Sequence, residues 1–328
     1  MSDLHPYVSG PAPRAQRRGQ EHFFAELDES GLGAVDAVAD SGAPSSMWGE
    51  AWAKLRRRPL FWVSAAIIVL VCTVAVFPSL FTSQDPRFCE LGSSLQPPSR
   101  EHLFGFDRQG CDLYSRVVYG ARASVTVGVV STAIVLLLGT LIGAFAGFFG
   151  GRLDTLLSRT TDIFFAVPLV LAAIVIMQVT GSRSTWTVAF VLAAFGWPPI
   201  ARIARGAVMS VKNNDYVTAA RALGAGRLSV LGHHILPNAA APIIVYATVA
   251  LGTFIVAEAT LSFLGVGLPP SVVSWGGDIS QAQASLRTRP AVLFYPAGAL
   301  ALTVLGFIMM GDAVRDALDP RVRSVKRR

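Results

Sequence analysis

The stretch YVTAARALGAGRLSVLGHHILPNAAAP, at positions 216–242, is a polar segment with a helical pattern that lies between long apolar runs. Asp215, just before it, is a plausible N-cap, and the good helix formers that follow stop at Gly224 and Gly226. A second short helix is predicted for residues 227–234. The stretch is therefore predicted to form a helix, a turn and a second helix, and it carries no side chains that resemble a catalytic set.

The composition around this stretch is that of a membrane protein. Hydrophobic residues make up 52% of the 328-residue chain and charged residues only 15%, against about a quarter in soluble domains. The basic residues are mostly arginines that flank apolar runs and do not gather on one face, which favours a role in membrane orientation over nucleic-acid binding.

Six apolar segments are long enough to cross a bilayer, which takes roughly 20 residues of helix because backbone polar groups cannot stay unpaired in lipid. The sequence thus predicts an all-α, polytopic membrane protein. The predicted spans are residues 60–81, 121–149, 162–180, 186–203, 243–263 and 291–310.

Charge sets the predicted orientation. If the N-terminus is inside, most Lys and Arg residues fall in inner segments, and the run KLRRRP at 54–59 is the strongest anchor. Both termini are then cytoplasmic, in a cell membrane. Residues 82–120 form an external segment, residues 204–242 an inner loop, and residues 315–328 a basic cytoplasmic C-terminus.

The N-terminal region divides into two parts ahead of the membrane domain, which is assigned to residues 60–314. Residues 1–46 show no sustained period and are predicted to be a mostly disordered cytoplasmic tail. Residues 47–59 repeat large apolar side chains on one helical face, which predicts either an interfacial amphipathic helix or a simple N-terminal extension of the first span.

Small residues and prolines predict how the spans pack. Gly139, Gly143 and Gly147 recur at four-residue intervals, which lets a neighbouring helix approach closely. Kinks are expected in the third and fourth spans at three prolines, Pro168, Pro198 and Pro199.

Glu258 is the one acidic residue well inside a predicted span. A carboxylate there costs at least a few kcal/mol and usually faces the bundle interior or a cavity, which makes it the candidate pore-lining residue. The alternative is a side chain that snorkels toward the outer face about a turn away.

Several kinds of chemistry have no motif in this chain. No GxxxxGK[ST] phosphate loop occurs, so energy from ATP has to come from another chain. No histidine falls in a predicted span and no Cys/His spacing indicates a metal site. The chain is predicted to be non-catalytic by itself and to hold no cofactor.

The inner loop resembles the EAA loop of binding-protein-dependent ABC importer permeases, in its two alanines, its glycine and the HILP run. In that family the loop forms a coupling helix that sits in a cleft of the ATPase subunit. The resemblance assigns coupling to ten residues of this loop: Asp215, Thr218, Ala219, Ala220, Gly224, Gly226, His234, Ile235, Leu236 and Pro237.

Four further segments narrow the resemblance to the C-type permease of oligopeptide and dipeptide importers; they are residues 102–128, 147–171, 261–277 and 311–323. It implies the type I ABC importer permease fold and transport of peptides. The implied partners are a homologous second permease, two ATP-binding subunits that bind ATP and Mg, and an external solute-binding protein. A same-family permease for nickel, haem or another solute stays open, as does a stand-alone secondary transporter or channel.

The chain departs from the family pattern at three places, one of which is His234 at the position of a consensus Ile. Thr218 stands where the family often has Glu, which removes a charge and the reciprocal half of a capping box opened by Asp215. Cys111 replaces a usually polar residue of the external segment. Because Cys89 is also predicted to be outside, an oxidising compartment would allow a Cys89–Cys111 disulfide.

Overall fold

The computed structural model describes residues 47–318, which contain helices and no β-strand. Within them, two isolated β-bridges join Cys89 to Cys111 and Phe106 to Asp112. The all-α prediction is confirmed for this part of the chain. The predictions for residues 1–46, and for the part of the basic C-terminus after residue 318, lie outside the described residues.

Among the described residues, four helical runs are each long and apolar enough to cross a membrane. They are α3 Pro59–Val76, α4 Leu113–Phe149, the run Arg227–Phe263 and α13 Ala291–Leu318. The third run is made of three continuous parts, α10 Arg227–Ser229, the π-helical η3 Val230–Ile235 and α11 Leu236–Phe263.

Two further stretches are bent helix pairs. α5 Gly151–Ala166 and α6 Leu169–Thr180 meet at an 80° bend, and α7 Thr185–Gly196 and α8 Pro198–Val211 meet at 48°. Pro168 and Pro198 stand at these breaks, as predicted, because proline cannot donate to the helical ladder and its ring crowds the preceding turn. Residues 47–318 thus hold up to six spans if each bent pair counts as one.

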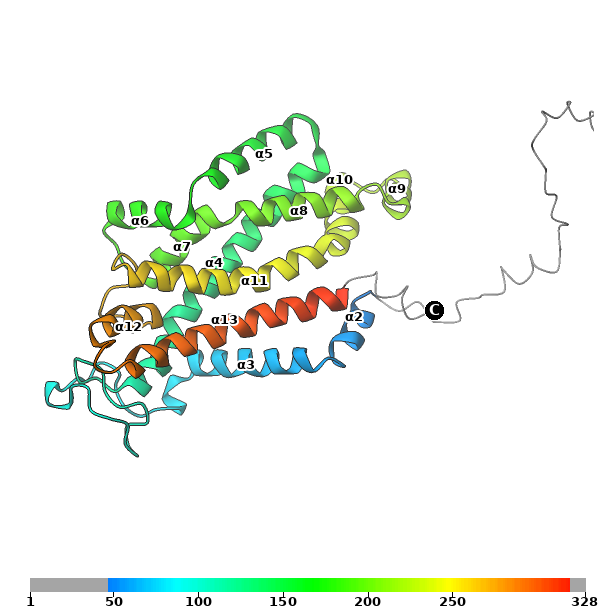
Figure 1. Cartoon of the computed structure of the whole chain (residues 1–328). Coiled ribbons are helices and arrows are strands. Elements are labelled where there is room, and N and C mark those ends of the chain that lie inside the picture. The colour runs from blue at the N-terminus through cyan, green and yellow to red at the C-terminus, as the bar shows by residue number, and fades with distance from the viewer. Residues whose placement is uncertain (1–46, 319–328) are drawn as a thin grey trace, which may run out of the picture. The chain divides into compact units, whose positions relative to one another are not determined.

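The remaining helices are short. They are α2 Met47–Leu55, η1 Pro78–Leu80, η2 Leu91–Ser93, α9 Asp215–Ala222, α12 Trp275–Ala282 and η4 Gln283–Ser285. α2 is separated from α3 by a turn at residues 56–58, so it is not a continuous extension of the first span. α2 and α9 lie near the same end of the described part, and α12 lies near the other (Figure 1).

Several helix ends differ from the predicted spans, because caps and not the limits of an apolar run decide where a helix begins. α4 begins eight residues before the predicted span, where Asp112 accepts a 2.8 Å hydrogen bond from the backbone N–H of Ser115. α11 begins before residue 243, α13 continues past residue 310, and α3 ends at Val76 just before η1. α5 begins before residue 162, and α8 continues past residue 203.

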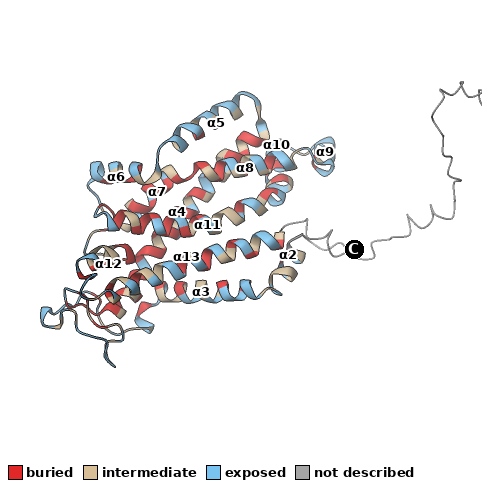
Figure 2. Ribbon diagram, in the orientation of Figure 1, coloured by how far each residue is buried: buried red, intermediate tan, exposed pale blue. Residues whose placement is uncertain are grey.

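The contact between α4 and α8 is built on the predicted glycine face of α4. A Cβ on Gly139 would lie 2.9 Å from the carbonyl oxygen of Trp197, and one on Gly147 would lie 2.7 Å from that of Arg205. A Cβ on Gly143 would overlap the carbonyl oxygen of Ala201. The buried residues of α4, α8 and α11 gather where these helices meet (Figure 2).

Apolar side chains also cover outward faces of the helices. Val69 on α3, Val179 on α6 and Phe294 on α13 are each more than three-fifths exposed within the single chain. Such exposure is expected of helices that contact lipid or another membrane subunit, since neither surface penalises apolar groups.

Candidate coupling site

The loop between α8 and α11 begins with α9, whose first residue is Asp215. The N-cap is Asn214, in an extended conformation and with no side-chain cap bond, so the prediction that Asp215 is the N-cap was wrong by one residue. Asp215 instead places its carboxylate in the first turn, which the helix dipole favours. Thr218 is then one position too far along for the capping box, and its hydroxyl bonds back to the Asn214 carbonyl at 3.4 Å.

α9 ends in a Schellman motif. The N–H of Ala225 donates to the carbonyl of Ala220 and that of Gly224 donates to Arg221, with Gly224 at φ +86°. A Cβ on Gly224 would meet nothing within 4 Å. Within this chain, glycine is therefore required by backbone conformation and not by a close neighbour.

The inner face of α9 is anchored by Val217, which is fully buried. It belongs to an apolar cluster with Ala144 of α4, Val208 of α8, and Val230 and Ile235 of η3. The short helix is therefore packed against α4, α8 and η3 through this cluster and is not a free loop.

The outer face of the loop carries exposed apolar side chains that the sequence analysis did not single out. Leu223, at the C-cap of α9, is 89% exposed, and Leu228 in α10 is 65% exposed. Leu223 lies within the turn held by the Schellman motif, and Leu228 lies in the short helix that follows it, so two large exposed apolar side chains stand five residues apart in the loop. We call Leu223 and Leu228 the apolar tip.

The other predicted coupling residues are divided between this outer face and the packed interior. Thr218, Ala219, Gly226 and Pro237 are exposed, whereas Ile235 is fully buried. The remaining three, Ala220, His234 and Leu236, are half-buried. The structure thus brings the first half of the motif to the surface and uses the second half partly for packing.

The second half of the loop is not the separate short helix that was predicted. It runs through η3 into α11 without a break, and the N–H of Leu236 reaches the carbonyl of Leu231 in a wide π turn. The side chain of Asn238 donates to the His234 carbonyl at 2.7 Å. α10 is therefore continuous with a helix that is long and apolar enough to cross a membrane.

An ion pair and a hydrogen bond connect the helices at the same end of the bundle. Arg205 of α8 makes two hydrogen bonds, of 2.6 and 2.7 Å, to the carboxylate of Asp154 in α5. Lys212, just after α8, donates to the carbonyl of Gly147 at 2.7 Å. These contacts hold α5 and α4 to α8 beside the loop.

Glu258 is fully buried in α11. Its carboxylate accepts hydrogen bonds from Ser124 of α4 at 2.9 Å and from Ser262 at 2.8 Å. Ser124 in turn accepts from the N–H of Trp275 at 3.3 Å, which ties α12 to the same group. The side chain therefore does not snorkel to the outer face, and its pore-lining role stays a prediction.

The external segment is held by Arg116 at the start of α4. Its guanidinium bonds Asp278 of α12, with Nε 3.0 Å from Oδ1, and donates to the Pro86 carbonyl at 3.4 Å. Asp107 lies 3.6 Å from the same guanidinium. Burial raises the pKa of Asp278 to about 6, although Arg116 acts in the opposite direction.

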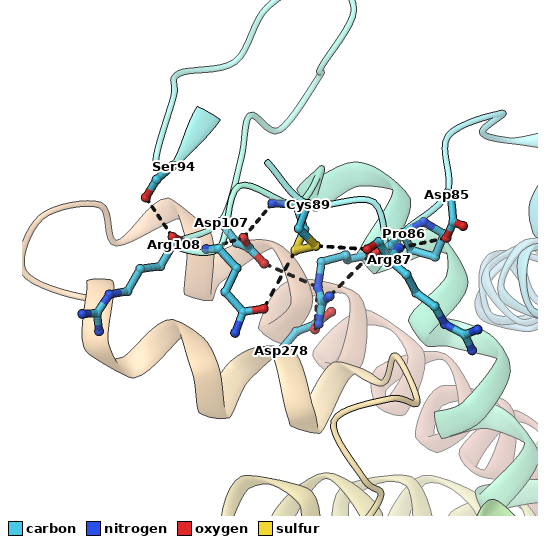
Figure 3. Close-up of a disulfide and its surroundings, with 11 residues drawn as sticks. Asp85, Pro86, Arg87, Cys89, Ser94, Asp107, Arg108 and Asp278 are labelled. Atoms are coloured by element: carbon cyan, nitrogen blue, oxygen red, sulfur yellow. Dashed lines mark hydrogen bonds and ion pairs between the residues drawn. A yellow bond between two sulfur atoms is a disulfide. The ribbon is translucent and has the colours of Figure 1, made fainter. Parts of the chain in front are cut away.

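Cys89 and Cys111 are disulfide-bonded in this segment. The bond lies beside Asp107 and above Asp278, as Figure 3 shows. The N–H of Cys111 donates to Asp107 Oδ1 at 2.9 Å, so the disulfide helps to present Asp107 to Arg116. Cys72, in α3, is not paired.

Comparison with known proteins agrees with this architecture. The family described as the inner membrane component of binding-protein-dependent transport systems matches residues 139–324, and the N-terminal transmembrane domain of oligopeptide transport permease C matches residues 46–98. An inward-facing structure of the MetNI methionine ABC transporter superposes with a TM-score of 0.53 at 19% identity, covering 62% of this chain and 96% of that one. That likeness shows the fold, a type I ABC importer permease.

Curated relatives cover almost the whole chain. The oligopeptide transport system permease protein OppC of Bacillus subtilis is 38% identical over 90% of this chain and 97% of its own length. The dipeptide permease DppC of Alkalihalophilus pseudofirmus is 38% identical over 85% and 91%, and the glutathione permease GsiD of Escherichia coli O6:K15:H31 is 37% identical over 84% and 91%.

The chain belongs to the family of binding-protein-dependent transport system inner membrane components. It is a multi-pass membrane permease subunit of an ABC importer, as the sequence predicted.

Proposed function

We propose that this chain is one of two permease subunits of an importer for oligopeptides or dipeptides. The match of residues 46–98 to the N-terminal domain of an oligopeptide permease supports this cargo class, as do the three relatives whose names carry peptide substrates. The second permease is a homologous chain that covers part of the exposed apolar surface, and an external solute-binding protein delivers the peptide to the segment 82–112.

The coupling loop docks onto a separate ATPase subunit. The observation that carries this proposal is the apolar tip, because two strongly exposed leucines, one on a rigid turn and one in the helix that follows it, are suited to a shallow apolar pocket of a partner. The two ATPase subunits bind ATP and Mg, and this chain is itself non-catalytic. In this proposal the chain has six spans with both termini in the cytoplasm, and the tip faces the ATPase.

The proposed transport mechanism depends on the contacts of the loop with α4, α8 and α11. When the ATPases close on ATP, α9 moves with them, and Val217 transmits that movement to α4 and α8 through the shared apolar cluster. The continuous helix from Arg227 to Phe263 transmits it to α11. Two rigid connections from one docking surface allow a small shift at the tip to change the packing of three long helices.

Gly224 offers a test of this coupling with a matched control. Gly224→Val is expected to reduce ATP-driven peptide uptake by the reconstituted complex at least ten-fold, because a β-branched residue is strained at φ +86° and the turn that presents Leu223 is lost. Gly224→Asn is expected to retain most uptake, because asparagine tolerates this conformation. Uptake is measured in proteoliposomes loaded with ATP.

Equal uptake by Gly224→Val and by the unmodified chain would show that the turn is not needed for coupling. Co-purification of the ATPase with each variant separates failed docking from failed transmission.

A further inference from the structure

A recess of about 460 Å³ lies beside the coupling loop, between the end of α4 and the turn that joins α9 to α10. Five residues line it: Phe148 and Phe149 of α4, Arg221 of α9, Ala225 of the turn, and Arg227 of α10. None of these five is acidic. The recess thus combines two positive charges with an aromatic wall.

Neither arginine of the recess is neutralised within the described part of the chain. Arg221 and Arg227 are exposed and make no ion pair with any described residue. The guanidinium carbon of Arg221 lies 5.5 Å from the centre of the Phe148 ring, a cation–π contact that orients the charge without cancelling it. Asp215, the only acidic residue of the loop, lies about 9 Å from Arg221 along the axis of α9.

The departure at Thr218 leaves Arg221 without a neighbouring carboxylate. Thr218 lies three residues before Arg221 on α9, a spacing at which side chains of a helix are neighbours. A glutamate at this position could pair with the arginine, whereas the threonine hydroxyl bonds back to the carbonyl of Asn214. The guanidinium is therefore free to pair with a group from another chain.

The other two basic residues of this region, Arg205 and Lys212, already have partners within the chain. Arg205 bonds a carboxylate of α5, and Lys212 donates to a carbonyl of α4. Arg221 and Arg227 instead stand two residues and one residue from the leucines of the apolar tip. The unpaired charges therefore adjoin the surface that docks in the proposed function.

We propose that this recess receives an acidic side chain of the ATPase subunit, bound by the guanidinium groups of Arg221 and Arg227. The proposal rests on the proposed function, in which the same subunit docks at the apolar tip. Arginine suits a carboxylate because its planar group presents several N–H donors in a fixed geometry. Such a pair fixes the register of docking, which apolar contacts alone do not.

The test measures the Kd of the transporter's own ATPase subunit for the permease pair, reconstituted in phosphatidylcholine nanodiscs. Arg221→Glu/Arg227→Glu is expected to raise the Kd at least about ten-fold at low salt, because each reversed charge repels the carboxylate. Arg221→Lys/Arg227→Lys is expected to lose less affinity, because both positive charges remain. Added NaCl should weaken binding of the unmodified chain more than binding of the charge-reversed variant.

Arg152→Glu is the matched control for the charge reversal. Arg152 is an exposed arginine of α5, three residues after Phe149, that makes no ion pair with any described residue and does not line the recess. Its variant is expected to change the Kd by less than about three-fold. An equally small change in Arg221→Glu/Arg227→Glu overturns the proposal. A loss that requires phosphatidylglycerol in the nanodisc assigns the arginines to a lipid headgroup and also overturns it.

Leu223→Asp separates this proposal from the function on which it rests. If Leu223→Asp abolishes ATPase binding while Arg221→Glu/Arg227→Glu retains it, the loop is still the docking site and the acidic partner is wrong. If neither variant weakens binding, the proposed function fails together with the inference.

Discussion

Gly143→Leu is expected to prevent the chain from reaching its folded state. The new side chain would begin where the carbonyl oxygen of Ala201 in α8 already lies, and backbone atoms of a packed helix cannot move aside as a flexible side chain can. We expect a loss of about 3 kcal/mol or more, at the upper end of what overpacking costs. The measurement is the fraction of monodisperse protein in detergent and its Tm.

Gly298→Leu is the matched control for this variant. It makes the same substitution in the membrane-crossing helix α13, at a glycine whose Cβ would meet nothing within 4 Å. We expect its Tm to stay within about 2 °C of the unmodified chain. Equal stability of Gly143→Leu and Gly298→Leu would contradict the close packing of α4 on α8.

Arg116→Leu is expected to destabilise the protein by about 3–5 kcal/mol, the cost of breaking a buried ion pair by removing one partner. The substitution leaves Asp107 and Asp278 buried without a positive partner. The expected result is a strong decrease in Tm. Arg100→Leu, an exposed arginine of the same segment that makes no ion pair among the described residues, should have almost no effect.

A second substitution separates charge from packing in this prediction. In Arg116→Leu/Asp278→Asn one of the two unpaired carboxylates is removed, so we expect the double variant to recover part of the lost Tm. If the double variant is as unstable as the sum of its single variants, the ion pair is not the reason for the loss.

Helix contacts and helix breaks could be predicted from the sequence wherever the residues of one helix face, or a single proline, are enough to cause them. The glycines of α4 and the break at Pro168 fall in this group, because close approach and a missing N–H are properties of the residues themselves. The ends of α4 and α11 could not be predicted from apolar runs, because a polar cap at Asp112 and a π turn before Leu236 extend each helix beyond its membrane-length core.

Only part of the candidate site could be predicted, because its remaining contacts depend on how the helices pack against one another. The motif residues of the coupling loop could be named, but the sequence did not show that Val217 points inward while Leu223 points outward, since that depends on where α9 packs. The pairing of Arg116 with Asp278 joins residues 162 positions apart, and no local pattern predicts it. Glu258 could be recognised as unusual, but its serine partners come from two helices.

The proposed function requires that this permease does no work without a separate ATPase docked at its coupling loop. Peptide uptake into proteoliposomes tests it most directly, with the purified chain reconstituted alone and together with a second permease, the ATPase subunits and the binding protein. We predict uptake only in the complete assembly, only with ATP, and with its loss in Leu223→Asp. Uptake by the chain alone in response to an ion gradient would contradict the claim.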